Sequence, residues 1–149
     1  MTNRLKQFIN DFYLNLIFFI SFLGFLGSLY FSEVEDFPPC DLCWYQRALL
    51  YPIFPISLIG LITKDKNVWK YILPFSLVGM PMAFYQYLTQ KTDWFITLGT
   101  CSPENPCSEI TVEYFGFITI PFMSFIAFAV VNVLILLYLL FRLKSSSED

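Results

Sequence analysis

Histidine is absent from this chain of 149 residues, and charged residues are scarce. Without histidine the chain has no His-based catalytic triad, no His-ligated haem and none of the usual catalytic zinc sites that contain histidine. Charged residues make up 14% of the sequence, whereas an ordinary soluble domain has about 25%. The basic residues form no block, so nucleic acid is not an expected partner.

Apolar side chains are present in excess. Hydrophobic residues make up 56% of the chain and aromatic residues 20%, with 18 phenylalanines. A soluble domain of this size could not bury so much apolar surface. The composition therefore predicts an all-α integral membrane protein, with membrane lipid as its surroundings.

Four apolar stretches approach or reach the length of a membrane-spanning helix, which needs roughly 20 residues to cross a hydrocarbon core about 30 Å thick. The first is longer than the core of a usual signal peptide, and no A-x-A-like cleavage site follows it, so we interpret it as a retained anchor. The chain is predicted to be one four-helix transmembrane bundle over residues 1–149. Its spans are expected at approximately 12–32, 43–63, 71–90 and 115–141, with outer loops at 33–42 and 91–114.

The distribution of basic residues predicts the orientation of this bundle. If both termini are cytoplasmic, seven of the nine basic residues lie inside, and only Arg47 and Lys91 lie outside. The acidic residues divide in the opposite sense, with eight outside and four inside. All four cysteines then face the oxidising side of a bacterial inner membrane, toward the periplasm or the cell exterior.

The first cysteine pair is the C-x-x-C motif of Cys40 and Cys43, which follows Pro38 and Pro39. A disulfide across so small a ring constrains few residues, so it is a poor structural staple but a good redox centre. The prolines favour a helix start, which would place Cys43 in a first turn where the positive helix end stabilises a thiolate. The negative charge of Asp41 opposes this effect slightly.

The second pair, Cys101 and Cys107, is separated by five residues, two of which are prolines. On its own this pair could be a structural disulfide or a redox couple. Two dithiols on one membrane face can exchange disulfides, because thiolate attack needs only access and alignment. A zinc site is the other alternative for the four cysteines, but their spacing is unusual for zinc, so we predict no metal site.

Arg47 is a charged residue within the second predicted span. Such a charge is costly and indicates a functional site, although near the interface an arginine can also reach out to water. Arg47 follows Cys43 by four residues, so the two share a helix face about 6 Å apart along the axis. There its guanidinium can stabilise a thiolate or hold an oxygen that gains charge on reduction. Gln46, on the adjacent edge, could add a hydrogen-bond donor.

Residues 40–47, Cys-Asp-Leu-Cys-Trp-Tyr-Gln-Arg, resemble the C-x-x-C-x-x-x-R signature of the bacterial disulfide bond formation protein B (DsbB) family. The resemblance covers nearly the whole chain, because a second cysteine pair precedes the fourth span and residues 116–122 resemble the start of the family's last span. Best-known members have a widely spaced second pair. The short loop between Cys101 and Cys107 resembles that of the branch of the family often called BdbC.

The resemblance implies an enzyme that reoxidises a thioredoxin-like, DsbA-type thiol oxidase and passes the electrons to membrane quinone, either ubiquinone or menaquinone. By motif position, the reduced partner would attack Cys101, and the released Cys107 would engage Cys40. Cys43 would be left as the thiolate facing quinone. Arg47 would hold a quinone oxygen.

Two other functions remain open from the sequence. A vitamin-K-epoxide-reductase-like quinone oxidoreductase shares four helices, a C-x-x-C motif and quinone chemistry, but its catalytic motif lies near a later helix. A non-enzymatic membrane subunit with two structural disulfides would have no redox cycle. Cycling of the Cys40–Cys43 couple with added quinone separates an enzyme from such a subunit.

Overall fold

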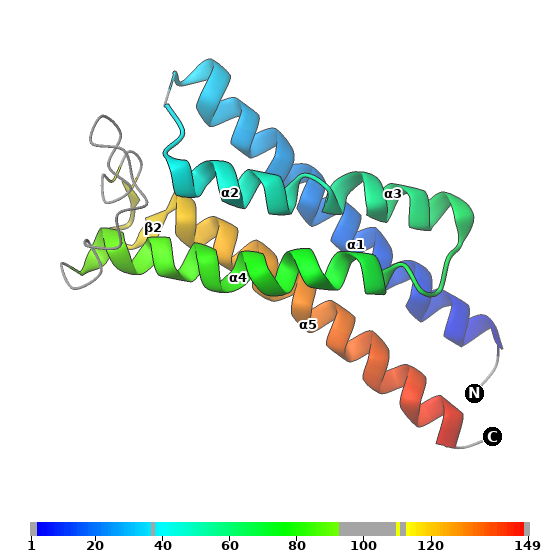
Figure 1. Cartoon of the computed structure of the whole chain (residues 1–149). Helices are drawn as coiled ribbons and strands as arrows, with labels where there is room; N and C mark the ends of the chain where they lie inside the picture. Colours follow the sequence, from blue (N-terminus) through cyan, green and yellow to red (C-terminus); the bar gives the residue numbers. More distant parts are fainter. Residues whose placement is uncertain (1–2, 37, 93–109, 111–112, 148–149) are drawn as a thin grey trace.

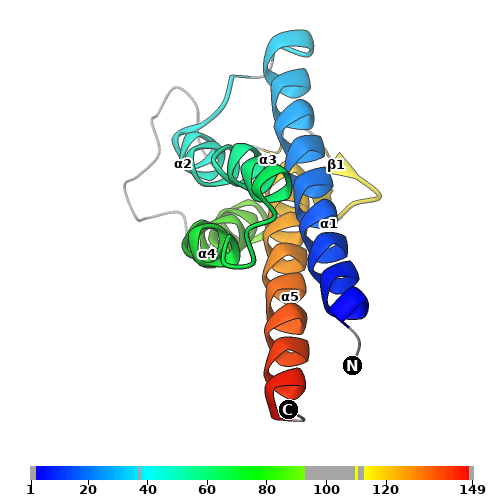
Figure 2. The same cartoon turned by 90° about the vertical axis from the view of Figure 1, so that its right-hand side faces the viewer.

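The computed structural model describes residues 3–36, 38–92, 110 and 113–147, which form a bundle of helices (Figure 1). Helix α1 (Asn3–Leu29) continues into a short π-helix, η1 (Tyr30–Val34). Helix α5 (Ile120–Ser147) runs antiparallel beside α1, as both views show (Figures 1 and 2). The remaining elements are α2 (Asp41–Leu50), α3 (Ile53–Thr63), α4 (Trp69–Lys91), β1 (Glu113–Tyr114) and β2 (Ile118–Thr119).

The path of the chain places its termini and the start of α2 at opposite ends of the bundle. Helices α2 and α3 follow one another in nearly one line, and α4 returns beside them (Figure 1). Both chain termini lie at one end of the bundle, whereas the start of α2 lies at the other (Figure 1). The cysteine motif is therefore remote from the termini.

The second predicted span, 43–63, is two helices in the structure. Helix α2 ends at Leu50, and Pro52 is the residue that caps α3. Proline has no backbone N–H and its ring clashes with the preceding turn, so a continuous helical ladder is interrupted here. Cys43, Gln46 and Arg47 therefore lie on a separate helix of ten residues, α2.

The first and last predicted spans also differ from the helices. Helix α1 begins at Asn3 and, with η1, reaches Val34, which extends the predicted 12–32 in both directions. Helix α5 begins at Ile120 instead of residue 115, because the preceding residues form the β1–β2 hairpin. Phe115 and Gly116 turn the hairpin with φ angles of 55° and 80°, which a right-handed helix cannot include.

Three helical stretches in the described part of the chain are long and apolar enough to cross a membrane. They are Phe12–Val34, Asp41–Thr63 and Ile120–Leu143. Helix α4 has 23 residues and so has the length of a span, but it is not among them. It packs against both α5 and α2, with buried polar residues such as Ser76 and Gln86 on its inner side. A mostly helical membrane protein is confirmed, and the fourth crossing remains a prediction.

The contact between α4 and α5 is close. A Cβ placed on Gly79 would lie 2.5 Å from Cε1 of Phe128, so the missing side chain allows the two helices to approach. Beside it, Ser76 Oγ donates to Asn132 Oδ1 over 2.9 Å, and Asn132 Nδ2 donates to the Ser76 carbonyl over 3.1 Å. Polar side chains that pair across helices in this way join them without leaving unsatisfied groups in the interior.

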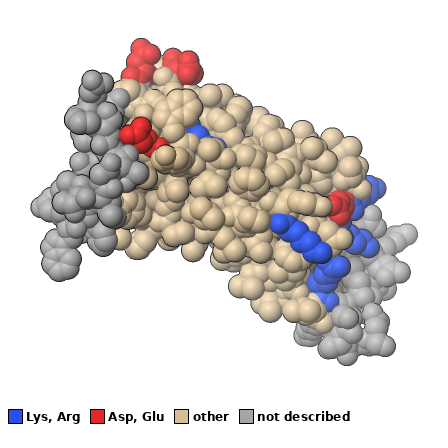
Figure 3. Space-filling model, viewed as in Figure 1, with Lys and Arg blue, Asp and Glu red and all other residues tan. Residues whose placement is uncertain are grey.

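In the view of Figure 3, charged side chains gather toward the two ends of the bundle and its middle is largely uncharged. Lys and Arg residues concentrate at the end that carries the chain termini and the α3–α4 connection (Figure 3). Acidic residues follow the end of α1, where Glu33, Glu35 and Asp36 lie close to the start of α2. Most of the basic residues thus lie at one end of the bundle and the C-x-x-C motif at the other, and the membrane side that each end faces remains a prediction.

Candidate functional site

The C-x-x-C motif lies at the start of α2. Cys40 is the N-cap residue, with φ −69° and ψ 168°, and its carbonyl accepts a hydrogen bond from the Trp44 amide over 3.1 Å. Pro38 and Pro39 precede it and cannot extend the helix backward. The structure confirms the predicted helix start. Cys43 lies in the first turn, where unpaired amides and the helix dipole favour negative charge.

Cys40 and Cys43 are free thiols whose sulfur atoms lie 2.8 Å apart. The hydrogen bond with Cys43, followed by burial, raises the pKa of the Cys40 thiol. Cys43, in the first turn of α2, is the sulfur at which the helix dipole favours a thiolate.

Gln86 of α4 contacts both sulfurs. Its Nε2 donates to Cys40 Sγ over 3.0 Å and to Cys43 Sγ over 3.2 Å. Gln46 of α2 donates its own Nε2 to Gln86 Oε1, so the oxygen of Gln86 faces Gln46 and the nitrogen faces the sulfurs. Both glutamines are buried. Gln46 therefore lies next to the two cysteines, with Gln86 between it and the sulfurs.

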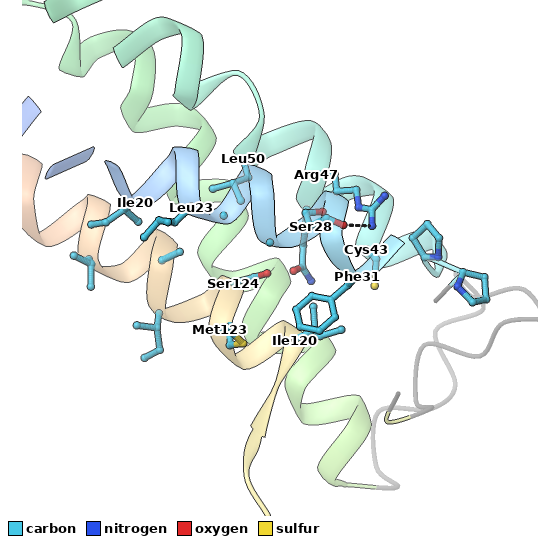
Figure 4. A pocket seen from close by; sticks show the side chains of 18 residues that line it. Ile20, Leu23, Ser28, Phe31, Cys43, Arg47, Leu50, Ile120, Met123 and Ser124 are labelled. Carbon is cyan, nitrogen blue, oxygen red and sulfur yellow. Dashed lines mark hydrogen bonds between the residues drawn. The ribbon is translucent and has the colours of Figure 1, made fainter. Parts of the chain in front are cut away.

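Arg47 is held by α1 and η1. Its Nη2 donates to the Ser28 carbonyl over 3.2 Å (Figure 4). Its Nη1 donates to Ser32 Oγ over 3.3 Å. The guanidinium carbon also lies 5.3 Å from the centre of the Trp44 ring. These contacts fix a partly buried cation beside Cys43 and keep it from extending freely into water.

A pocket of about 380 Å³ lies between α1, η1, α2 and α5, which is within the usual range for small-molecule sites. Its polar lining comes from Cys43, Gln46, Arg47 and two serines. Arg47, Cys43 and Phe31 lie near one end, while Ile20 and Leu23 lie toward the other (Figure 4). The apolar lining residues include Ile20, Leu23, Phe31, Leu50, Ile120, Met123, Ile126, Ala127 and Val130.

Gly27 of α1 contributes to the size of this pocket. It lines the cavity, and a Cβ placed on it would meet nothing within 4 Å. Several of the apolar lining residues are about half exposed, among them Leu23 at 52% and Met123 at 50%. The pocket thus has a polar, sulfur-containing end and an accessible apolar end.

The structure brings together four of the six predicted site residues: Cys40, Cys43, Gln46 and Arg47. Cys101 and Cys107 lie outside the described residues, so their pairing and position remain predictions. Among the residues that are described, no group of three or more His, Cys, Asp or Glu could hold a metal ion.

Gln86 was missed by the sequence reasoning. It lies 46 positions after Cys40 and 43 after Cys43, and it belongs to no motif shared with them. The only available signal was a glutamine within an apolar stretch, which by itself also fits a residue that joins helices.

Comparisons with known proteins agree with this site. A family model described as "Disulfide bond formation protein DsbB" matches residues 10–138. The chain is 47% identical over 128 residues to the SPbeta prophage-derived disulfide bond formation protein B of Bacillus subtilis (strain 168), covering 84% of this chain and 83% of that protein. It is 44% identical over 112 residues to disulfide bond formation protein C of the same organism, covering 75% and 81%.

A more distant bacterium has a similar protein. The chain is 39% identical over 123 residues to a probable disulfide formation protein of Coxiella burnetii (strain Dugway 5J108-111), covering 82% of this chain and 84% of that protein. No solved structure matches.

The apolar helices and the free C-x-x-C pair define a membrane protein of thiol–disulfide oxidation. The chain belongs to the DsbB family of disulfide bond formation proteins. The predicted family is therefore confirmed, and the match to disulfide bond formation protein C agrees with the short-loop branch. The family match also favours this assignment over the vitamin-K-epoxide-reductase-like alternative.

Proposed function

We propose that the protein is a quinone-dependent thiol–disulfide oxidoreductase that reoxidises a thioredoxin-like, DsbA-type thiol oxidase and passes the electrons to membrane quinone. One observation carries this proposal: Cys43, Gln46 and Arg47 line a single pocket whose other walls are mainly apolar. A lipid-soluble acceptor with a polar ring and an apolar tail matches that division. A structural disulfide would need no such pocket.

The residues present fit a quinone. Arg47 offers a cation to a ring oxygen, and the apolar walls suit an isoprenoid tail. Leu23 and Met123 line the pocket and are about half exposed, which suits entry of an apolar molecule between α1 and α5. The space beside Gly27 keeps the pocket wide between its two ends.

A bound quinone supplies an acceptor for two electrons and two protons. Closure of the disulfide from a Cys40 thiol and a Cys43 thiolate releases two electrons and one proton at the pocket wall, because Cys43 lines the cavity and Cys40 lies beside it. The second proton comes from solvent. Arg47 is placed to stabilise an oxygen that gains negative charge. The N-terminus of α2 favours the Cys43 thiolate before the disulfide closes.

The second cysteine pair would supply the electrons. A thiolate of the reduced partner attacks the Cys101–Cys107 disulfide at Cys101 and releases Cys107. Cys107 then attacks the Cys40–Cys43 disulfide at Cys40 and releases Cys43 as a thiolate. The partner's second thiol then displaces Cys101, which leaves the partner with its own disulfide. Cys101 attacks Cys107 of the Cys107–Cys40 disulfide, which restores Cys101–Cys107 and releases Cys40. Each exchange breaks one disulfide and forms another, and after all four, two electrons have moved from the partner to the C-x-x-C pair.

The proposed setting is a bacterial inner membrane crossed four times, with α4 as the third crossing and both termini in the cytoplasm. The gathering of Lys and Arg at the end with the termini supports this orientation (Figure 3). The start of α2 then faces the periplasm or the cell exterior, where a secreted thiol oxidase can reach it.

The decisive experiment follows the cysteines during turnover. The purified protein receives a reduced thioredoxin-like oxidase and either ubiquinone or menaquinone, and its thiols are alkylated at successive times. We expect Cys40 and Cys43 to become reduced by the partner and to reoxidise only when quinone is added. A couple that stays oxidised throughout is a structural bridge and overturns the proposal. Identification of the quinone that copurifies distinguishes the two acceptors.

A further inference from the structure

We propose that Gln86 sets the redox equilibrium of the Cys40–Cys43 couple by donating its two amide hydrogens to the two sulfurs. The inference rests on the proposed function only in that the couple is taken to cycle. Gln86 comes from α4, whereas both cysteines lie at the start of α2. Its side chain is 1% exposed, so water cannot replace the hydrogen bonds that it makes.

The hydrogen bonds of Gln86 account for its whole amide group. A glutamine amide has two N–H donors and one carbonyl acceptor. The two donors face Cys40 Sγ at 3.0 Å and Cys43 Sγ at 3.2 Å, and Gln46 donates to the oxygen. Rotating the amide by half a turn would place an oxygen against both sulfurs and an N–H against the N–H of Gln46. With Gln46 as the donor, the orientation of Gln86 that accepts from Gln46 is also the one that donates to the cysteines.

The two redox states differ in how well they accept these hydrogen bonds. Reduction of the Cys40–Cys43 disulfide takes up two electrons and one proton when it yields a Cys40 thiol and a Cys43 thiolate. A thiolate is a charged acceptor and binds an N–H donor more strongly than a neutral disulfide sulfur does. Gln86 therefore stabilises the reduced pair more than the oxidised pair, which raises the reduction potential of the couple.

This effect acts on both half-reactions in opposite senses. A higher potential favours transfer of electrons into Cys40–Cys43 from the second cysteine pair, and it lowers the driving force for their release. Gln86 thus makes the couple accept electrons from the second cysteine pair more readily and release them less readily. Gln46 acts as its positioning residue, and because Gln46 also lines the pocket, it links the pocket to the sulfurs through one side-chain contact.

The test measures the equilibrium of the couple in the full-length protein. Cys101→Ala/Cys107→Ala protein, which keeps only the Cys40–Cys43 pair, is equilibrated in dithiothreitol buffers without added quinone, and its thiols are alkylated and counted by mass. Gln86→Leu in this background should decrease the equilibrium constant for reduction about tenfold, which corresponds to a potential ~30 mV more negative for two electrons. Should Gln86→Leu fail to fold, Gln86→Met has a similar length and no donor and gives the same test.

Asn132→Leu is the matched control. Asn132 is also an amide within the bundle that joins α4 to α5, but its hydrogen bonds go to Ser76 and Met80. The control should lower the unfolding temperature and leave the potential unchanged. If Gln86→Leu behaves in the same way, with reduced stability and an unchanged potential, Gln86 merely joins helices and the inference is wrong.

Gln46 provides a second comparison. Gln46→Leu removes the contact that orients Gln86, so it should shift the potential in the same direction by a smaller amount. The double variant Gln46→Leu/Gln86→Leu should match Gln86→Leu alone, since Gln46 acts through Gln86. Additive shifts would contradict this relation. A wild-type couple that never cycles with quinone would overturn the proposed function, whereas normal cycling with an unshifted Gln86→Leu potential would overturn only the role of Gln86.

Discussion

Gly27 and Gly79 lie in two regions of the bundle where the absence of a side chain has opposite effects. On α1, Gly27 lines the pocket, and a Cβ there would meet nothing within 4 Å. On α4, a Cβ at Gly79 would lie 2.5 Å from the ring of Phe128. The absent side chain leaves open space in the first case and allows close packing in the second. The region between α1, α2 and α5 thus has room for a ligand, while the α4–α5 contact provides rigid support.

Polar side chains also differ between the α4–α5 contact and the pocket. At the α4–α5 contact, Ser76 and Asn132 satisfy one another. Around the pocket, Cys43 and Arg47 lie at the cavity wall, where they can meet a ligand. Gln86 connects the two regions, because it belongs to α4 and reaches the sulfurs at the start of α2. Substitutions in the two regions should therefore affect different measurements.

The largest effect is expected from Cys43→Ser. A hydroxyl cannot form the disulfide with Cys40, so quinone-dependent turnover should fall to background while the unfolding temperature stays near that of the wild type. Turnover is followed by the absorbance of added quinone. Retained turnover in this variant would show that the C-x-x-C pair takes no part in the reaction, and the pocket region could then not be assigned a redox function.

Arg47→Gln should have the second-largest effect. It removes a charge-assisted hydrogen bond of roughly 1.5–3 kcal/mol, so we expect about a 10- to 150-fold loss of quinone-dependent efficiency. Arg47→Lys keeps the charge but loses the planar fork, and its loss should be smaller. Exchange with the partner is measured separately and should remain near normal. Equal slowing of both half-reactions would show that Arg47 mainly holds α2 against α1.

Gly79→Ala tests the close-packed region. The added methyl group must displace the Phe128 ring, and overpacking of this kind costs about 1–3 kcal/mol. Unfolding in detergent, followed by circular dichroism, should show the loss, while the quinone KM of the folded fraction stays unchanged. Phe128→Leu in the same chain should recover part of the stability. If the double variant is no more stable than Gly79→Ala, the contact with Phe128 is not the cause.

Gly27→Leu should have the smallest effect and the opposite pattern. A leucine side chain fills part of the pocket, so we expect quinone KM to rise about tenfold, equivalent to ~1.4 kcal/mol. The unfolding temperature should not fall, because the added atoms enter open space. Lower stability with an unchanged KM would reverse the roles that we assign to the two glycines.

Local features of the sequence predicted much of the site. Pro38 and Pro39 indicated where α2 begins, and the spacing from Cys43 to Arg47 placed both on one helical face beside the pocket. These inferences depend on neighbouring residues and on the repeat of a helix, which are visible in one segment. The family resemblance rested on the same segment and was confirmed by the comparisons.

Features that depend on tertiary contacts were not predicted. Nothing near Gln86 indicates that its amide meets two sulfurs from another helix. The pocket likewise arises from α1, α2 and α5 together, and the open space beside Gly27 depends on what those helices leave unfilled. The start of α5 was placed too early because the left-handed backbone at Phe115 and Gly116 leaves no strong pattern in an apolar stretch.

The interruption at Tyr51 and Pro52 has a consequence for energy coupling. Helix α2 has ten residues, and at ~1.5 Å per residue it extends about 15 Å, half of a hydrocarbon core about 30 Å thick. In the proposed orientation, the segment from Cys43 to Leu50 lies in the outer leaflet. Electrons and protons leave the couple without crossing the bilayer midplane. Disulfide formation by this protein should therefore proceed at the same rate whether or not the membrane carries a voltage.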